Sequence, residues 1–370
     1  MGGEPPVTEG VSLYNEGINP YVGDMFHETP LGLFVYDWMI RNLAQWMGII
    51  FICCDLMTAH LLYKTACLFM KELCQQQTEQ RKNYAKDCAA LLLKPEDLTL
   101  APIYVASVYL FNPYTIFTCV RDCRVASFSL LQQLQSLYPV LLLVPVCIYI
   151  GRQSRSTCRS VFLTTATFAC SLTALIFVCR GLAGNWEFLD ATYGFILNVP
   201  DLRPNIGLFW YFFTEMFEHF RPLFICAFQI NATVLYVVPL TFRLHYEPML
   251  LAASLTALTA IFKSYPSLGD VGLYLALLPM WKHLFHYMQQ GFVVGCFFLI
   301  TSVLGPIVWH LWIYSRSANA NFYFGVTLAF ATAQIFLITD ILFAFIKREF
   351  SLFNGLRREV DGKPAKLVLD

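Results

Sequence analysis

Long apolar runs recur along the chain from Leu31 to the carboxyl end, and short polar stretches separate them. A bilayer core about 30 Å thick needs about 20 apolar residues in helical conformation. Windows of that size predict eight or nine membrane helices. They cover residues 46–70, 101–120, 127–150, 161–183, 222–242, 248–262, 291–314 and 322–346, with 268–285 as a shorter, broken candidate.

The same runs indicate helices rather than strands. Every backbone polar group in lipid must be hydrogen-bonded within its own structure, and the runs show no alternating, glycine-bounded strand pattern typical of a barrel. We therefore expect an all-α fold, a polytopic transmembrane helical bundle. No repeat, linker or low-complexity stretch divides residues 1–370, which predicts a single integral membrane domain.

Basic residues predict which ends of the helices face the cytosol. Residues 71–94 are rich in Lys and Gln, and Arg152, Arg155 and Arg159 follow another apolar run. The positive-inside rule assigns both segments to the cytosol. If each span crosses once, the tail 347–370 is also cytosolic. Residues 1–30 then form a luminal N-terminal loop, together with luminal segments 185–221, 264–270 and 315–321.

Composition supports a membrane protein and argues against nucleic-acid binding. The 370 residues are 57% hydrophobic and 14% charged, whereas soluble domains have about 25% charged residues. The formal net charge is zero, so no basic excess exists to neutralise phosphates. The 13 cysteines lie scattered in apolar runs without CxxC pairs, as expected of small buried apolar residues.

The N-terminal segment carries the first candidate site. Glu16, Asp24, His27 and Glu28 precede an apolar run, but no Asp-x-Asp pair is present to start a metal site with substrate phosphates. One interpretation is a turn-rich loop followed by a capped helix. The other is a polar pocket for a lipid headgroup, lined by His27 and Glu28.

A second candidate lies in the aromatic run 207–221. Glu215, Glu218 and His219 are three and four residues apart, which predicts one face of a helix. These residues supply too few ligands for a metal site. An aromatic belt with charges at the membrane interface is one reading. A polar site for a headgroup or a partner protein is the other.

Residues 261–270 form the third candidate. Lys263 and Asp270 flank Tyr265 and Pro266 between apolar runs, and ionisable residues in such positions are expensive and often functional. A helix break there requires protein or a water-filled cavity to bond the freed backbone groups, which predicts a pocket. A Lys263–Asp270 pair that closes an interhelical turn is the structural alternative.

The fourth candidate precedes the last span. Asn319 and Asn321 carry amides that can donate to and accept from sugar hydroxyls or phosphate oxygens. Helix capping is the competing role. The chain has no Gly-x-Ser-x-Gly elbow, no Gly-Lys-Ser phosphate loop and no His-Glu-x-x-His motif. We therefore expect no catalytic residue, no metal and no cofactor.

Several of these runs carry a family resemblance over nearly the whole chain. They are residues 12–30, 111–115 (Phe-Asn-Pro-Tyr-Thr), 136–139 (Ser-Leu-Tyr-Pro), 193–220, 261–270 and 309–321. Together they closely resemble the phosphatidylinositol glycan class U family, and the run 209–220 is highly specific. The resemblance implies a multi-pass endoplasmic-reticulum membrane subunit of glycosylphosphatidylinositol (GPI) transamidase. That complex replaces a carboxyl-terminal signal with a GPI lipid.

The resemblance also implies partner subunits and indicates which of them is catalytic. The chemistry is expected in the class K subunit, with class S, class T, the GPI attachment protein and the GPI lipid as further partners. The family is similar to the lipid-sugar mannosyltransferases of the GT-C fold, which use an Asp-x-Asp pair. Tyr14-Asn15-Glu16 takes its place here, which implies a transferase scaffold kept for binding GPI.

Two departures from the family pattern predict a truncated or spliced product. The hydrophobic helix that usually precedes the Ser-Leu-Tyr segment is absent, and residues 119–136 are short by roughly one membrane helix.

Three functions remain open from the sequence. A binding subunit presents GPI, or the apolar signal of the proprotein, to a partner. An active dolichol-phosphate-sugar transferase requires a carboxylate base near an acceptor hydroxyl. A transporter would use the broken helix at Pro266, although no half-to-half repeat supports it.

Overall fold

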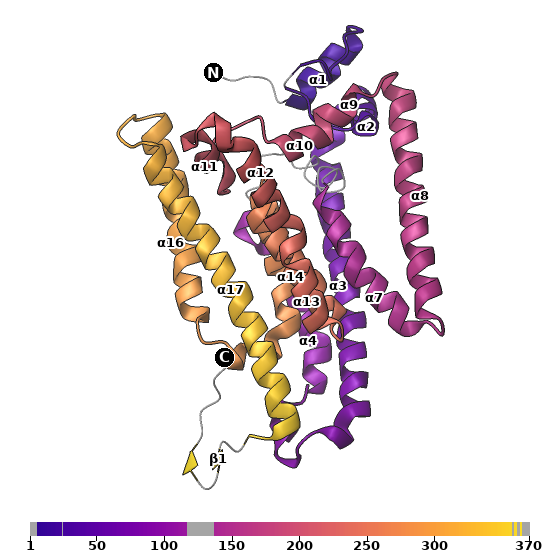
Figure 1. The fold of residues 1–370 in the computed structure, drawn as a ribbon, viewed down its shortest axis with the longest axis vertical. Helices are drawn as coiled ribbons and strands as arrows, with labels where there is room; N and C mark the ends of the chain where they lie inside the picture. Colours follow the sequence, from indigo (N-terminus) through magenta and orange to yellow (C-terminus); the bar gives the residue numbers. More distant parts are fainter. Residues whose placement is uncertain (1–5, 24, 117–136, 357–358, 361–362, 365–370) are drawn as a thin grey trace.

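The computed structural model describes residues 6–23, 25–116, 137–356, 359–360 and 363–364. The chain in these ranges is mostly helical, and its helices run largely along one long axis (Figure 1). The strands β1 (Glu359–Val360) and β2 (Lys363–Pro364) form one short antiparallel pair. The predicted all-α fold class is confirmed.

The helices vary in length from one turn to many turns. Their bounds are α1 (Pro6–Asn15), α2 (Pro30–Leu43), α3 (Met47–Gln80), α4 (Pro95–Phe111), α7 (Leu143–Gln153), α8 (Thr157–Ala183), α9 (Glu187–Leu189), α10 (Phe195–Asn198), α11 (Phe209–Glu215), α12 (Arg221–Ile230), α13 (Val237–Leu244), α14 (Pro248–Phe262), α15 (Leu268–Leu277), α16 (Gly291–Ile313) and α17 (Ala320–Asn354). A 3-10 helix, Leu278–Tyr287, follows α15.

Five helical stretches of the described chain are long and apolar enough to cross a membrane. They are Pro30–Asn83, Thr157–Ala183, Glu218–Leu244, Gly291–Ile313 and Ala320–Asn354, and the helices Tyr138–Gln153 and Pro248–Phe262 are apolar but shorter. The predicted spans 248–262 and 291–314 match α14 and α16 within one residue. The predicted spans 101–120 and 127–150 extend into residues 117–136, which lie outside the described ranges. The segment 119–136, predicted to be short by one membrane helix, lies wholly outside them.

Proline and its neighbours set several helix ends. Helix α2 begins at Pro30. Proline lacks a backbone N–H, which costs nothing at this position because the first N–H groups of a helix have no partner inside it. The Thr29 hydroxyl accepts a hydrogen bond from the backbone N–H of Gly32. Helix α4 ends at Phe111 because Asn112, which precedes Pro113, adopts an extended conformation. Helix α4 therefore begins and ends earlier than the predicted span 101–120.

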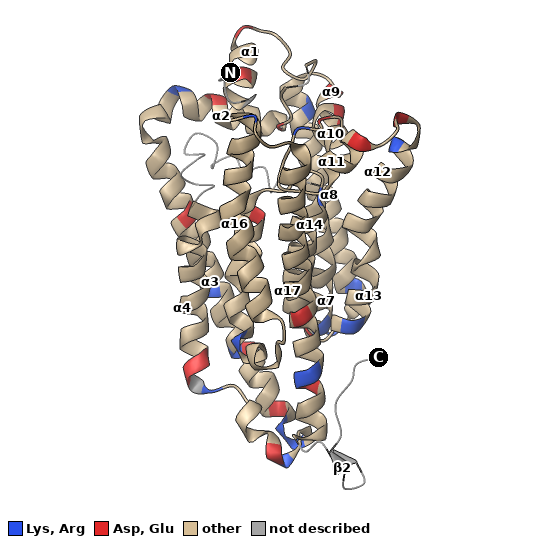
Figure 2. Ribbon diagram, turned by 90° about the vertical axis from the view of Figure 1, so that its left-hand side faces the viewer, with Lys and Arg blue, Asp and Glu red and all other residues tan. Residues whose placement is uncertain are grey.

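The segments that the sequence assigns to the two sides of the membrane lie at opposite ends of the bundle. Helices α1, α9, α10 and α11 and the turn between α16 and α17 form the upper end in Figure 1. The carboxyl ends of α3 and α17 lie at the lower end, and the α7–α8 turn points the same way. Most charged residues gather near these two ends (Figure 2). Helices that cross a membrane in alternating directions place the segments of its two sides at opposite ends of the bundle, as found here.

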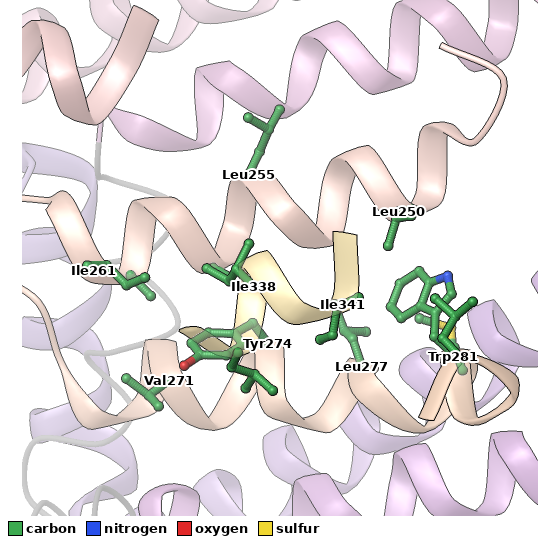
Figure 3. Packing of buried hydrophobic residues seen from close by; sticks show 14 of the residues in the cluster. Leu250, Leu255, Ile261, Val271, Tyr274, Leu277, Trp281, Ile338 and Ile341 are labelled. Carbon is green, nitrogen blue, oxygen red and sulfur yellow. The ribbon is translucent and has the colours of Figure 1, made fainter. Parts of the chain in front are cut away.

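One large hydrophobic core joins the long helices. It contains Leu250, Leu255 and Ile261 of α14, which face Val271 and Tyr274 of α15 and residues of α17 (Figure 3). A smaller core joins α1, α2, α8 and α9 through residues that include Phe26, Tyr36 and Phe188. A third cluster, Val199, Phe209 and Phe213, lies in and before α11, so the described chain has one large apolar core and two smaller ones.

Asp340 of α17 fixes the start of α16. Its carboxylate is buried, with 5% of the residue exposed, and accepts hydrogen bonds from the backbone N–H groups of Gln289 and Gln290 at 2.8–3.1 Å. The first N–H groups of a helix have no partner inside it, and a carboxylate there also favours the helix dipole. Asp340 therefore ties the last two long helices together.

We expect Asp340→Ala to lower the free energy of unfolding by about 3 kcal/mol, because it leaves two N–H groups unbonded in the bundle interior. Unfolding in mixed detergent micelles measures this loss. Thr339→Ala, at an exposed neighbouring position, should stay within about 0.5 kcal/mol of the wild type. Equal effects of the two substitutions would contradict the capping role.

Candidate functional site

The break between α14 and α15 brings Lys263 and Asp270 together. Lys263 Nζ lies 2.5 Å from Asp270 Oδ2, and the two side chains are only 12% and 11% exposed. Ser267 caps α15, since its Oγ accepts from the backbone of Asp270, and Asp270 Oδ2 accepts from the backbone and hydroxyl of Ser267. The structure thus supports the interhelical ion pair that the sequence left as an alternative to a pocket.

Side chains from other elements bond the backbone that this break frees. The Tyr138 hydroxyl accepts from the backbone N–H of Ser264 at 3.1 Å and lies 3.0 Å from the Ser264 hydroxyl. Gln229 of α12 donates to Ser264 Oγ and to the carbonyl of Ile196, at 2.9 and 2.8 Å. A polar network inside a membrane protein is stable when all its members are bonded. Protein side chains therefore fill the break.

An aromatic stack connects this break to the N-terminal segment. The ring of Phe195 lies between His27 and Tyr265, with centroid distances of 3.5 and 4.8 Å and interplanar angles of 16° and 12°. His27 Nδ1 is 2.9 Å from the carbonyl oxygen of Ala191, and the Tyr265 hydroxyl donates to the carbonyl of Asp201. His27 and Tyr265, two predicted site residues far apart in sequence, thus both stack on the ring of Phe195.

Gly207 permits a close approach beside this stack. A Cβ atom at position 207 would lie 2.6 Å from Cγ of Pro266, which is closer than van der Waals contact allows. The chain leading into α11 therefore packs directly on the break. This contact couples the position of α11 to that of residues 263–267.

The expectation that Glu215, Glu218 and His219 share one helix face is wrong. Helix α11 ends at Glu215, the chain is extended at Met216, and a separate 3-10 turn holds Glu218 and His219. The reason is Pro222, whose ring would clash with the carbonyl four residues earlier if the helix continued. All three side chains are exposed, and Glu218 pairs with Arg221 at 3.5 Å.

Asn319 and Asn321 have different local roles. Asn319 caps α17, because its Oδ1 accepts from the backbone of Phe322 at 3.3 Å. Asn321 Oδ1 accepts from the hydroxyl of Tyr211 in α11 at 2.8 Å. Both asparagines are exposed. The amide N–H groups of Asn321 remain able to donate to a ligand.

Aromatic rings surround Asn321 on the protein side. Tyr211 stacks on Phe324 at 4.2 Å, and Trp210 stacks on Trp312 at 6.2 Å. Trp210 also lies 6.1 Å from Tyr323. This cluster of Trp210, Tyr211, Trp312, Tyr323 and Phe324, here called the aromatic cluster, joins α11 to α16 and α17. It places an exposed amide beside large rings at the upper end of the bundle.

Glu28 belongs to the N-terminal segment and directly precedes the Thr29 cap of α2. Only 9% of the residue is exposed, and its Oε2 has no hydrogen-bond partner within the described part of the chain. Burial raises the pKa of Glu28 to about 7. A carboxyl group in this state changes charge near neutral pH, which is uncommon outside functional sites.

The structure therefore divides the predicted residues into separate groups. His27, Lys263, Tyr265 and Asp270 lie at or beside the break, Asn319 and Asn321 lie beside the aromatic cluster, and Glu28 is buried near Tyr21 and Tyr36. Asp24 lies outside the described residues. Within those residues, no three His, Cys, Asp or Glu side chains gather as metal ligands would.

Sequence reasoning did not find the residues that connect these groups. Phe195 and Tyr211 are ordinary side chains for apolar helices, and their roles arise from contacts between distant segments. Gln229 is a polar residue in an apolar helix, which is a signal of a hydrogen bond to another element. Tyr138 and Phe195 do lie in runs that carry the family resemblance. Their residue types alone gave no signal for the contacts they make.

The chain matches a known family model and several characterised relatives. The model described as GPI transamidase subunit PIG-U matches residues 6–126 and 123–330. The human protein named GPI-anchor transamidase component PIGU is 39% identical, over 98% of this chain and 90% of the relative. The GPI transamidase component GAB1 of Saccharomyces cerevisiae is 28% identical, over 94% of this chain and 86% of the relative.

The buried ion pair makes a prediction about stability. Lys263→Met should lower the free energy of unfolding by about 3–5 kcal/mol, because it leaves the carboxylate of Asp270 buried without its cation. Unfolding in mixed micelles measures the loss. The double variant Lys263→Met, Asp270→Asn should recover part of it, since Asn keeps a capping oxygen without the charge. Additive losses in the double variant would refute the coupling.

Glu28 makes a prediction about pH. Its pKa in the folded protein, about 7, lies above the ordinary value of 4.5, so the folded state binds more protons between these values. The stabilisation is complete below pH 4.5 and is lost as pH rises through 7, by about 3 kcal/mol in all. Glu28→Gln should therefore remove this slope of unfolding free energy against pH. The exposed Glu16→Gln is the control, and an unchanged slope in Glu28→Gln would contradict the assignment.

Proposed function

Because the chain belongs to the PIG-U family of GPI transamidase subunits, we propose that it is a non-catalytic, multi-pass subunit of GPI transamidase in the endoplasmic-reticulum membrane. The relatives named above are components of that enzyme. The Tyr14-Asn15-Glu16 segment lies at the end of α1, where Asn15 accepts a hydrogen bond from Arg41. It supplies no Asp-x-Asp pair, which supports a binding role over sugar transfer.

The partners follow from the same proposal. The class K subunit carries the cysteine-protease-like chemistry, and class S, class T and the GPI attachment protein complete the assembly. Residues 1–370 act as a single membrane domain, with the upper end in the lumen and the lower end in the cytosol. Arg152 lies in the last turn of α7, next to the α7–α8 turn that points toward the lower end (Figure 1), which supports this orientation.

Asn321 beside the aromatic cluster carries the lipid-binding part of the proposal. Its exposed amide can donate to a phosphate oxygen or a sugar hydroxyl, and the half-buried rings of Tyr211 and Phe324 stack beside it at the upper end of the bundle. A GPI lipid presents both phosphates and sugars at that level. The site therefore binds the GPI headgroup and presents it to the catalytic subunit.

Substitution of the asparagines tests this role in cells that lack class U. Asn321→Ala should lower surface display of a GPI-anchored reporter about tenfold, because it removes one ligand hydrogen bond worth about 1.4 kcal/mol. Flow cytometry measures the display. Co-precipitation of the other subunits should be unchanged, and a parallel loss of assembly would leave only a structural role.

Two matched variants separate capping from binding. Asn319→Ser retains an oxygen that can cap α17, whereas Asn319→Ala does not. If Asn319 also contacts GPI, both variants lower display. Tyr211→Phe removes the hydroxyl that orients Asn321 but keeps the ring stacked on Phe324, so a smaller loss than in Asn321→Ala is expected.

A further inference from the structure

A pocket of about 270 Å³ lies toward the lower end of the bundle. The residues that line it come from the carboxyl ends of α3, α7, α13 and α17 and from the turn between α13 and α14. In Figure 1 the carboxyl ends of α3 and α17 lie far from the α16–α17 turn, which directly precedes Asn321. The pocket is therefore separate from the site proposed for GPI.

Three arginines from three helices line this pocket. They are Arg152 of α7, Arg243 of α13 and Arg348 of α17. Arg243 pairs with Glu349, at 2.6 Å between Nη2 and Oε2, and its side chain is still 48% exposed. The ion pairs among the described residues include neither Arg152 nor Arg348. Two guanidinium groups at the pocket thus lack a carboxylate partner in the part of the chain that the structure describes.

Backbone carbonyls hold these two guanidinium groups in place. Arg152 is exposed, donates from Nη1 to the carbonyl of Tyr246, and lies over the Tyr246 ring, 5.9 Å from its centroid. Arg348 donates from Nη2 to the carbonyl of Leu91 at 3.1 Å, and only 6% of the residue is exposed. A carbonyl positions a guanidinium but leaves its charge uncompensated, which is costly at a buried position. A bound anion compensates that charge.

The carboxylates of the pocket do not cancel its positive charge. Among the described residues, Glu247 and Glu349 are the acidic side chains that line it, against three arginines. Glu247 lies in the turn between α13 and α14, where burial raises its pKa to about 7, although Arg152 and Arg348 lower it in part. Glu247 is therefore partly protonated at neutral pH. The lining keeps a positive excess in either protonation state.

Apolar side chains line the same pocket beside these charges. Leu73 of α3, Leu244 of α13 and Phe345 of α17 contribute to it, and so does Phe353, which is 47% exposed near the end of α17. A soluble anion gains nothing from an apolar wall. A phospholipid does, because its phosphate is joined to glycerol and acyl chains. The combination of arginines and apolar side chains therefore favours a lipid over a free anion.

A phosphate group suits the two guanidinium groups that lack a carboxylate. Its oxygens accept from more than one planar donor, and arginine commonly bonds phosphate through two parallel hydrogen bonds. Basic pockets between transmembrane helices on the cytosolic side bind the headgroups of anionic lipids. We propose that this pocket binds the phosphate of an anionic phospholipid through Arg152 and Arg348, in the leaflet that is cytosolic in the orientation proposed above.

Native mass spectrometry of the full chain in phosphatidylcholine nanodiscs tests the proposal, with phosphatidic acid as the probe at increasing mole fraction. The probe carries a phosphate without the choline cation of the bulk lipid, so the wild type should retain one molecule of it. Arg152→Gln should raise the mole fraction for half occupancy about tenfold, because it removes a charge-assisted hydrogen bond. Arg155→Gln removes the same charge from the α7–α8 turn, outside the pocket, and should bind as the wild type does.

A second variant should bind the probe more tightly, which a misfolded protein would not do. Glu349→Gln removes the carboxylate that pairs with Arg243 and frees a third guanidinium for the ligand. It should lower the mole fraction for half occupancy about threefold, as expected of a partly exposed charge. Glu79→Gln, at an exposed position of α3 outside the pocket, is the control. Equal half occupancy in the wild type, Arg152→Gln and Glu349→Gln would overturn the site.

Competition separates a lipid from a free anion. Inorganic phosphate at equal molar concentration should leave phosphatidic acid bound, because it lacks the chains that contact the apolar wall. Displacement would overturn the lipid part and assign the pocket to a soluble phosphate. Asn321→Ala should retain the probe fully, because Asn321 does not line this pocket. Failure of the GPI proposal in cells would therefore leave this binding measurement unchanged.

Discussion

Backbone groups freed between α14 and α15 must find hydrogen-bond partners inside the protein, because lipid supplies none. The structure meets this constraint with Asp270, whose carboxylate accepts from the backbone N–H of Ser267, and with Tyr138, whose hydroxyl accepts from the backbone N–H of Ser264. Lys263 lies 2.5 Å from Asp270 and balances its charge. Each partner comes from a different place in the sequence. The break therefore holds several elements in one arrangement, and the upper end of the bundle is organised around it.

The arrangement extends from this break toward the surface through short steps. Tyr265 stacks on Phe195, which stacks on His27, and Pro266 packs against Gly207 at the entry to α11. Helix α11 then presents Tyr211 to Asn321. The surface on α11 and α17 that is proposed to bind GPI is thus positioned by a buried polar network, as a preorganised site requires.

Much of the fold could be predicted from apolar run length, because a membrane imposes a length on its helices. The ion pair of Lys263 and Asp270 was among the predicted alternatives, because unpaired charges between apolar helices are costly. Interruptions of helices were harder to predict from the sequence. The apolar pattern of 207–221 hid the interruption at Met216 caused by Pro222, and the contacts of Phe195 depend on which distant segments meet. The buried state of Glu28 likewise depends on packing that no local pattern encodes.

The proposal that the chain is a working subunit of GPI transamidase is tested most directly by a pull-down from class-U-deficient cells. The full chain is expressed with an affinity tag, purified in mild detergent and scored for the other transamidase subunits, together with surface display of a GPI-anchored reporter. The account predicts that the subunits co-purify and that display returns. Absence of both, with the chain folded and present in the endoplasmic reticulum, would contradict it.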